Sequence, residues 1–145
     1  VDIYEKISLQ TLVDAGQVVI ACGGGGILVI YEGTRYKGVD AVIDKDFAAA
    51  KMAALIDADV FIILTAVDHV FVNFGKPDQK ALETTSVADM KQYISEDQFA
   101  PGSMLPKVEA AIDFAESKAG RRAIIASLEK ASETLDGNGG TTVQM

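Results

Sequence analysis

The sequence has few positive charges, one cysteine and no long hydrophobic run, and each absence excludes a class of protein. Thirteen Lys and Arg residues stand against twenty-one Asp and Glu residues, which gives a formal net charge of −8 over 145 residues. Binding to nucleic acid or to anionic lipid is driven by a basic surface, so neither is expected as a main partner. An acidic protein can still bind a phosphorylated ligand if a few cations are placed locally.

Cysteine and histidine are each present once. Cys22 has no partner for an intramolecular disulfide, so a reducing cytoplasm is the expected compartment. The lone His69 has no partner at the spacing of a metal site, and we expect no metal held by side chains. The longest hydrophobic runs fall far short of the roughly 18 residues that span a bilayer, and no signal-peptide pattern is visible. No membrane association is expected.

Short hydrophobic runs alternate with amphipathic segments along the whole chain. The length suits one ordinary domain, and 49% hydrophobic residues argue against disorder. Residues 18–22 and 60–65 are continuous hydrophobic runs rich in β-branched residues, which are typical of fully buried parallel strands, and residues 123–126 are predicted to form a further buried strand. Further strands are predicted at 27–31 and 70–74, and helices at 3–13, 46–56, 86–94, 104–118 and 128–135. The pattern predicts an α/β fold with a mostly parallel sheet covered on both faces, without a domain boundary inside residues 1–145.

Four consecutive glycines, Gly23 to Gly26, follow the first hydrophobic run. At the carboxyl end of a parallel strand, glycines let backbone N–H groups approach a ligand closely, and ligands usually bind at this edge. Neither G-x-x-x-x-G-K-[ST] nor G-x-G-x-x-G is present, however. The run is equally consistent with a ligand-binding loop and with a tight turn.

Two lysines stand where a helix is expected to begin. Lys45 follows Asp44, a good N-cap, and Lys107 follows a Pro-Gly-Ser turn. A cation in the first turn is disfavoured by about 0.3–1 kcal/mol, because the helix dipole is positive there. Lysines in this position indicate a negative ligand, and two lysines held by an aspartate such as Asp46 would suit phosphoryl transfer. The alternative for each is a solvated lysine paired with neighbouring carboxylates.

Residues 65–68 close another hydrophobic strand at what should be the same edge of the sheet. Their side-chain oxygens and backbone groups are candidates to bind a nucleotide, and nearby hydrophobic residues are candidates to contact its base. The latter are Val67, Phe71, Phe74 and Met104. Turn chemistry and core packing explain this segment at least as well. The acidic stretch at 129–136 is most simply a solvated helix face.

Five short motifs together carry a specific resemblance. They are Cys22-Gly23-Gly24-Gly25-Gly26-Ile27, Gly38-Val39-Asp40-Ala41-Val42-Ile43-Asp44-Lys45-Asp46, Leu64-Thr65-Ala66-Val67-Asp68, Asn73-Phe74-Gly75-Lys76-Pro77 and Gln98-Phe99-Ala100-Pro101-Gly102-Ser103-Met104-Leu105-Pro106-Lys107. In this order they closely resemble the carbamate kinases, which are members of the amino acid kinase family. The resemblance spans almost the whole chain but only the C-terminal half of the family's usual length. Leu28 departs from the family, which more often has proline there.

The resemblance implies a three-layer αβα sandwich in which residues 1–145 are the single nucleotide-binding, C-terminal lobe. It implies the reaction of ATP and carbamate to ADP and carbamoyl phosphate, with Mg²⁺ bound through the nucleotide phosphates, used for ATP synthesis in arginine fermentation by the deiminase pathway. Lys45 and Lys107 match the family's phosphate-stabilising lysines, and Asp46 matches the aspartate that orients them. With Phe71 added, the nucleotide site is expected to comprise Gly23, Gly24, Gly25, Thr65, Ala66, Val67, Asp68, Phe71, Ser103 and Met104.

The family's N-terminal lobe carries the acceptor loops and most of the contact of its homodimer, and nothing here replaces it. We therefore expect this chain to bind ADP or ATP weakly and not to turn over alone. An unpaired sheet edge should favour self-association or binding of the missing lobe. Two alternatives stay open. One is a sibling kinase acting on acetylglutamate, aspartate or UMP, which Lys45 and the intact motif at 101–107 disfavour; the other is a non-catalytic nucleotide-binding or assembly module.

Overall fold

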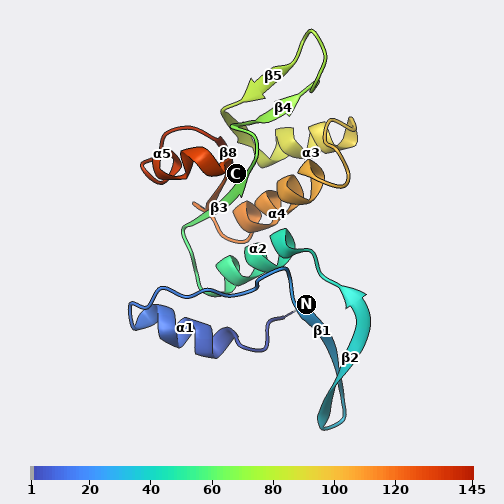
Figure 1. Cartoon of the computed structure of the whole chain (residues 1–145), viewed down its shortest axis with the longest axis vertical. Helices are drawn as coiled ribbons and strands as arrows, with labels where there is room; N and C mark the ends of the chain where they lie inside the picture. The colour runs from blue at the N-terminus through green and yellow to red at the C-terminus, as the bar shows by residue number, and fades with distance from the viewer. Residues whose placement is uncertain (1) are drawn as a thin grey trace.

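A four-stranded sheet lies at the centre of the computed structural model, which describes residues 2–145 (Figure 1). Its strands follow the order β3 (Val60–Thr65), β7 (Arg122–Ser127), β8 (Thr141–Gln144) and β6 (Thr84–Ser86). β3 pairs with β7 and β6 pairs with β8 in parallel, while β7 and β8 are antiparallel. The hydrophobic runs predicted at 60–65 and 123–126 are neighbouring parallel strands, so the predicted α/β fold with a mostly parallel sheet is confirmed.

Helices pack on this sheet, and one of them supplies the centre of the core. They are α2 (Lys45–Leu55), α3 (Val87–Ser95), α4 (Met104–Glu116), the 3₁₀ turn η1 (Leu128–Lys130) and α5 (Ala131–Leu135). Figure 1 shows α3 and α4 on one side of the sheet and α5 on the other. The inward face of α4 is at most 1% exposed and consists of Val108, Ala110, Ala111, Phe114 and Ala115. Its alanines let the helix approach β3, β7 and β8 closely.

Two helices begin at the residues expected to cap them. The side chain of Asp44 accepts a hydrogen bond from the backbone N–H of Asp46 at 2.8 Å. Ser86 Oγ accepts one from the N–H of Asp89 at 3.0 Å. Each cap satisfies a backbone donor that the helix itself leaves without a partner. No helix within residues 2–145 is long and hydrophobic enough to cross a lipid bilayer.

We call residues 44–145 the body and residues 2–43 the N-terminal region. The N-terminal region contains helix α1 (Lys6–Asp14) and an antiparallel hairpin of β1 (Ile27–Glu32) and β2 (Arg35–Val42). The prediction of a buried parallel strand at 18–22 is wrong, because Val18 and Ile20 are each 98% exposed and no strand is formed. A hydrophobic run becomes a buried strand only beside other strands, and none of the described strands pairs with this one.

Two further predictions need correction within the body. The strand predicted at 70–74 is the shorter β4 (Val70–Val72), which forms an antiparallel hairpin with β5 (Lys80–Leu82) outside the main sheet. It ends early because Asn73 has a positive φ of 54°. The helix predicted at 128–135 begins as η1 and becomes α-helical only at α5.

Candidate functional site

The carboxylate of Asp46 joins the two lysines at the predicted helix starts. Lys107 Nζ donates a hydrogen bond to Asp46 Oδ2 over 2.7 Å, and Lys45 Nζ lies 3.8 Å from the same oxygen. The side chains of Asp46 and Lys107 are 11% and 14% exposed, whereas that of Lys45 is 56% exposed. Burial strengthens the Asp46–Lys107 pair and fixes its geometry, while Lys45 stays accessible to a ligand.

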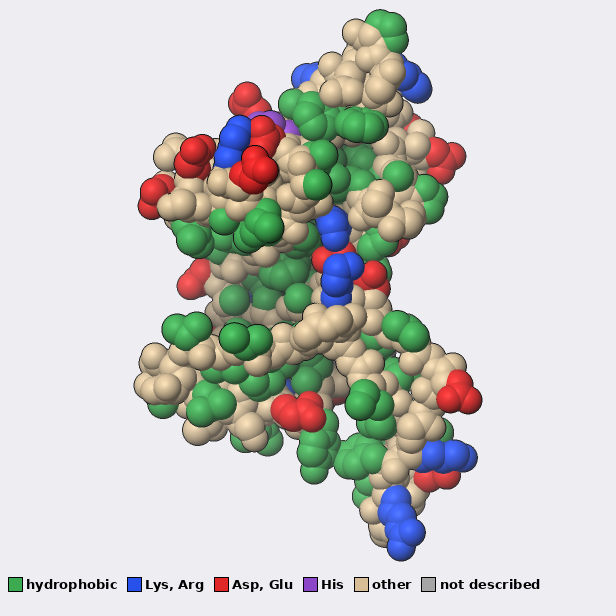
Figure 2. Space-filling model, viewed as in Figure 1, with side chains coloured by type: hydrophobic (Ala, Val, Ile, Leu, Met, Phe, Trp, Pro, Cys, Tyr) green, Lys and Arg blue, Asp and Glu red, His purple; other side chains and the backbone are tan. Residues whose placement is uncertain are grey.

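The three charged side chains lie near the carboxyl edge of the sheet. Short connections lead from the end of α2 into β3 and from the end of α4 into β7, and each helix packs against the strand that follows it. The first turns of both helices therefore lie toward the end where these parallel strands finish, which is where α/β sheets bind ligands. Figure 2 shows basic and acidic side chains side by side in the middle of this face. Two ammonium groups and one carboxylate leave a net positive charge for an anion.

The glycine run folds onto the start of α2 at one closely packed point. Gly25 is buried with φ of +142°, and a Cβ at this position would lie 2.1 Å from the carbonyl oxygen of Ile43 and 3.8 Å from the Lys45 nitrogen. Gly23 and Gly24 are exposed, with open space around them. Close packing thus explains Gly25, and the two glycines before it present accessible backbone beside Lys45.

Cys22 precedes this run and packs against α2. Its Sγ lies 3.7 Å from the carbonyl oxygen of Ala48. Burial, with a smaller contribution from the nearby carboxylate of Glu5, raises the pKa of the Cys22 thiol. The thiol is therefore protonated at neutral pH and is a poor nucleophile.

Predicted nucleotide-binding residues meet further along the same edge. Thr65 ends β3 directly beside Ser127, which ends β7. Beyond the exposed Ala66, the Asp68 carboxylate accepts a hydrogen bond from Lys130 Nζ at 2.6 Å. This hydrogen bond lowers the pKa of Asp68 and raises the pKa of Lys130. Both groups are therefore charged at neutral pH.

The residues predicted to contact a base come from three elements. Phe71 in β4 and Phe74 just after it pack with ring centroids 5.9 Å apart, and Phe74 is 67% exposed. Met104 is the half-buried first residue of α4, and Ser103 before it makes no side-chain capping bond. Val67 is half-buried in the loop after β3. No hydrogen bond or ion pair among the described residues links this group to the two lysines, so a shared nucleotide site stays a prediction.

Two residues at this edge, Ser127 and Lys130, were not predicted as site residues from the sequence. The strand at 123–126 was predicted, and residues after a parallel strand share an edge with those after its neighbour. That reasoning would have placed Ser127 beside Thr65. Lys130 instead was hidden at the start of a stretch interpreted as a solvated helix face. Within residues 2–145, no three His, Cys, Asp or Glu side chains gather as metal ligands.

Comparison with known proteins places this geometry in a family. The model of the amino acid kinase family matches residues 1–127. The carbamate kinase of Clostridium perfringens is 58% identical over 143 residues, which are 99% of this chain and 46% of that protein. The carbamate kinase-like protein YqeA of Escherichia coli is 56% identical over 143 residues, with the same two coverages.

A solved structure agrees with these sequence matches. The carbamate kinase of Giardia lamblia bound to AMP-PNP is 39% identical and superimposes with a TM-score of 0.93, over 99% of this chain and 50% of that one. The chain spans about half the length of the curated relatives it matches. On the family match, the identities and the shared fold, this chain belongs to the amino acid kinase family.

Proposed function

We propose that this chain is the nucleotide-binding half of a carbamate kinase, an enzyme that transfers a phosphoryl group reversibly between ATP and carbamate to give ADP and carbamoyl phosphate. The observation that carries the proposal is the Lys107–Asp46–Lys45 arrangement at two helix starts. Phosphoryl transfer depends mainly on positioning and charge neutralisation, which two lysines fixed by one carboxylate supply.

Each charged group has a separate role in this proposal. Asp46 holds the Lys107 ammonium through a 2.7 Å hydrogen bond, so that this lysine needs no reorganisation when the phosphates arrive. Lys45 is more exposed and approaches the transferred phosphoryl group. Gly23, Gly24 and Gly25 bring the backbone close to the same region, where the N–H groups of Gly23 and Gly25 donate to the carbonyl oxygens of Ala21 and Cys22. Mg²⁺ enters with the nucleotide, bound through its phosphates.

The nucleotide itself lies along the ends of β3 and β7 in this proposal. Its binding residues are Thr65, Ala66, Val67, Asp68, Phe71, Ser103 and Met104. The exposed ring of Phe74 and the half-buried Met104 offer apolar surface for a base. The carbamate kinase of Giardia lamblia, on which this chain superimposes, is bound to AMP-PNP, and this likeness supports the proposal of nucleotide binding.

The proposed function also implies a pathway, a compartment and an oligomeric state. A carbamate kinase of this kind would form ATP from carbamoyl phosphate in the arginine deiminase pathway, in the cytoplasm, as a homodimer. Because the chain spans about half of its relatives' length, we propose that it does not turn over alone. It would bind a nucleotide and associate with itself or with a polypeptide that supplies the missing lobe.

One observation favours a second candidate, a nucleotide-binding module without catalysis. The candidate site gathers groups that suit a nucleotide and its phosphates, and the chain spans about half the length of its curated relatives. Such a chain would bind ADP and would stay inactive both alone and together with the missing lobe.

An activity assay in two arms tests the proposal. ATP formation from ADP, Mg²⁺ and carbamoyl phosphate is measured first with this chain alone and then with the chain co-expressed with the first half of the Clostridium perfringens carbamate kinase. We expect no ATP in the first arm and ATP in the second. ATP formation by the chain alone would contradict the half-enzyme proposal, and ADP binding without activity in either arm would favour the module.

A further inference from the structure

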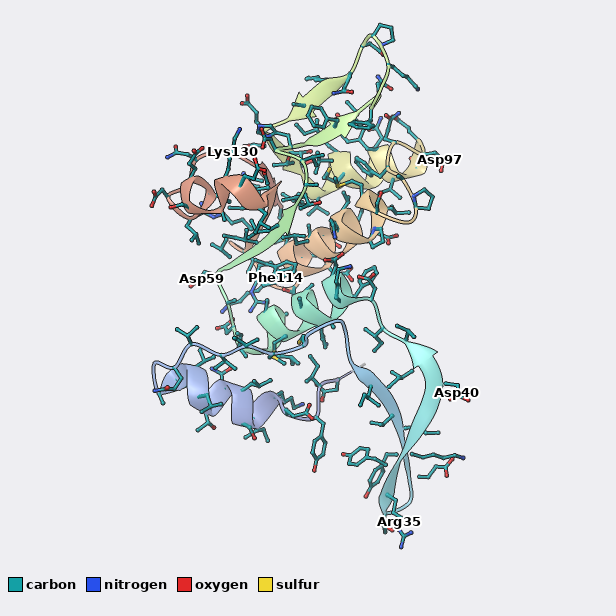
Figure 3. All side chains as sticks on the ribbon, in the orientation of Figure 1. Arg35, Asp40, Asp59, Asp97, Phe114 and Lys130 are labelled. Carbon is teal, nitrogen blue, oxygen red and sulfur yellow. The ribbon has the colours of Figure 1, made fainter. Side chains whose placement is uncertain are left out.

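Asp68 and Lys130 join two loops that are far apart in the sequence. Lys130 Nζ lies 2.6 Å from Asp68 Oδ2, across a separation of 62 residues. Asp68 belongs to the loop after β3, and Lys130 ends η1, directly after β7. Figure 3 labels Lys130 beside this end of the sheet. The ion pair therefore connects the segments that leave two paired parallel strands.

The loop after β3 is held at two more consecutive residues. His69 Nδ1 donates a hydrogen bond to the carbonyl oxygen of Gly140 at 3.0 Å, and the backbone N–H of Val70 donates to Thr141 Oγ1 at 2.8 Å. Gly140 in turn packs tightly on β7, because a Cβ there would lie 2.9 Å from Ala126 Cβ. Residues 68–70 are thus fixed to the segments at β7 and β8.

Among the described residues, the Asp68–Lys130 ion pair connects this loop to the residues after β7. The hydrogen bonds of His69 and Val70 reach β8 and the turn before it, whereas Asp68 reaches η1. β3 and β7 stay in register up to Thr65 and Ser127, and the strand pairing ends at these residues. A connection at this point controls how far apart the two segments lie, and a nucleotide in the proposed site would lie against both.

We propose that Lys130 is a positioning residue for the nucleotide: by pairing with Asp68, it holds residues 66–68 in the binding conformation before ADP or ATP arrives. This inference rests on the proposed function and adds a residue that no motif singled out. Holding a loop in its bound conformation improves affinity because less conformational entropy is lost on binding. The two side chains are 47% and 45% exposed, so the effect is a few-fold change in affinity.

The chain contains a matched control pair remote from this edge. Lys91 Nζ lies 2.7 Å from Glu116 Oε1, with side chains 53% and 42% exposed. This pair joins α3 to α4, on elements that do not carry the loop after β3. It has nearly the same length and exposure as the Asp68–Lys130 pair, so its loss should change the stability of the fold similarly without changing the affinity for the nucleotide.

The test is calorimetric titration of the full 145-residue chain with ADP and Mg²⁺, with thermal unfolding of each variant measured by circular dichroism. We expect Lys130→Met to raise the Kd for ADP about 3–5-fold at low salt, with a smaller change at high salt. Lys91→Met should leave the Kd unchanged. The conservative variant Lys130→Arg should keep the Kd within about 2-fold of that of the unchanged chain, because it retains the positive charge that pairs with Asp68.

The outcomes separate positioning from other roles. A Lys130→Met variant that lowers the unfolding temperature but keeps the Kd of the unchanged chain would overturn the inference and leave the proposed function intact. If Asp68→Asn weakens binding while Lys130→Met does not, Asp68 contacts the ligand directly and the inference is again wrong. If the unchanged chain binds no ADP, both the proposed function and this inference are wrong.

Discussion

The N-terminal region and the body contain similar hydrophobic runs and use them in opposite ways. Every buried hydrophobic residue of the described chain lies at or after Ala50, whereas most of the exposed large hydrophobic residues lie between Tyr4 and Val42. In the body, β3 pairs with β7 and packs under α4. In the N-terminal region, none of the strands formed within residues 2–145 pairs with the run at 18–22. The comparison shows that a hydrophobic run indicates the need for burial but does not supply the partner.

The candidate site lies where the two regions meet. Lys45 and Asp46 open the first helix of the body, and Gly25 of the N-terminal region packs against Ile43 and the backbone nitrogen of Lys45. The proposed phosphate-binding groups thus come from both regions, whereas the proposed nucleotide edge belongs to the body alone.

The largest difference is expected in the free energy of unfolding. Phe114 is 1% exposed, packs on Phe61 with ring centroids 5.5 Å apart, and lies under the guanidinium of Arg121. Phe114→Ala should destabilise the chain by about 3–5 kcal/mol, whereas Ile20→Ala should change the stability by less than about 0.5 kcal/mol. Urea unfolding measures both. Equal losses would mean that the N-terminal region shares the core.

The next effect concerns the point where the regions touch. In Gly25→Ala, the Cβ would meet the carbonyl oxygen of Ile43 at a φ of +142°, so the glycine loop must move away from α2. The strain should cost about 1–3 kcal/mol and weaken ADP binding in calorimetry. Gly24→Ala is the control, because a Cβ there has no atom within 4 Å. If the two variants bind ADP alike, the loop does not contribute to the site.

A smaller effect is expected in self-association. Val18 and Ile20 lie on an extended segment without charged residues, the kind of edge that pairs with another chain. Sedimentation of the unchanged chain should show concentration-dependent association, and the variant V18K/I20K should be monomeric at the same concentrations. Leu135→Lys, at a residue of α5 that is 75% exposed, is the control. An unchanged chain that remains monomeric would contradict this prediction.

The smallest effect is the pH dependence of stability. The ion pair with Lys118 lowers the pKa of Asp57, and the ion pair with Lys130 lowers the pKa of Asp68. A carboxyl with a lowered pKa in the folded state stabilises the fold above its ordinary value of about 3.9. This stabilisation is lost as the pH falls through the lowered pKa. Urea midpoints should therefore drop between pH 5 and pH 3, and less steeply in Asp57→Asn; an equal slope would exclude Asp57 as a contributor.

The sequence predicted the local features of the body and the site well. Asp44 as a cap, Lys45 and Lys107 at helix starts, and the strands at 60–65 and 123–126 all depend on neighbouring residues, so patterns a few residues long reveal them. The contact between Asp46 and Lys107, which are 61 residues apart, was suggested only by the chemistry of a lysine pair held by a carboxylate. Caps and charged residues at helix starts can be recognised in the sequence because they occupy fixed positions relative to the helix.

The failures share a physical cause, which is dependence on distant partners. Residues 18–22 and 60–65 are both hydrophobic runs rich in β-branched residues, and the neighbouring strand β7 distinguishes the second from the first. Residues 70–74 leave the main sheet because Asn73 adopts a positive φ and β5 pairs with β4. Lys130 was missed because its partner Asp68 lies on another loop. Surface ion pairs leave no periodic pattern to find.

The most direct test of the central claim is an ADP titration of this chain with one lysine removed at either end of α4. Lys107 is at the helix start, held by Asp46, and Lys118 lies beyond the helix end, paired with Asp57. We predict 1:1 binding of Mg²⁺–ADP by the unchanged chain, a loss of at least about 10-fold in Lys107→Met because a charged hydrogen bond to phosphate is removed, and no change in Lys118→Met. Equal affinities of Lys107→Met and the unchanged chain, or no binding by either, would contradict the account.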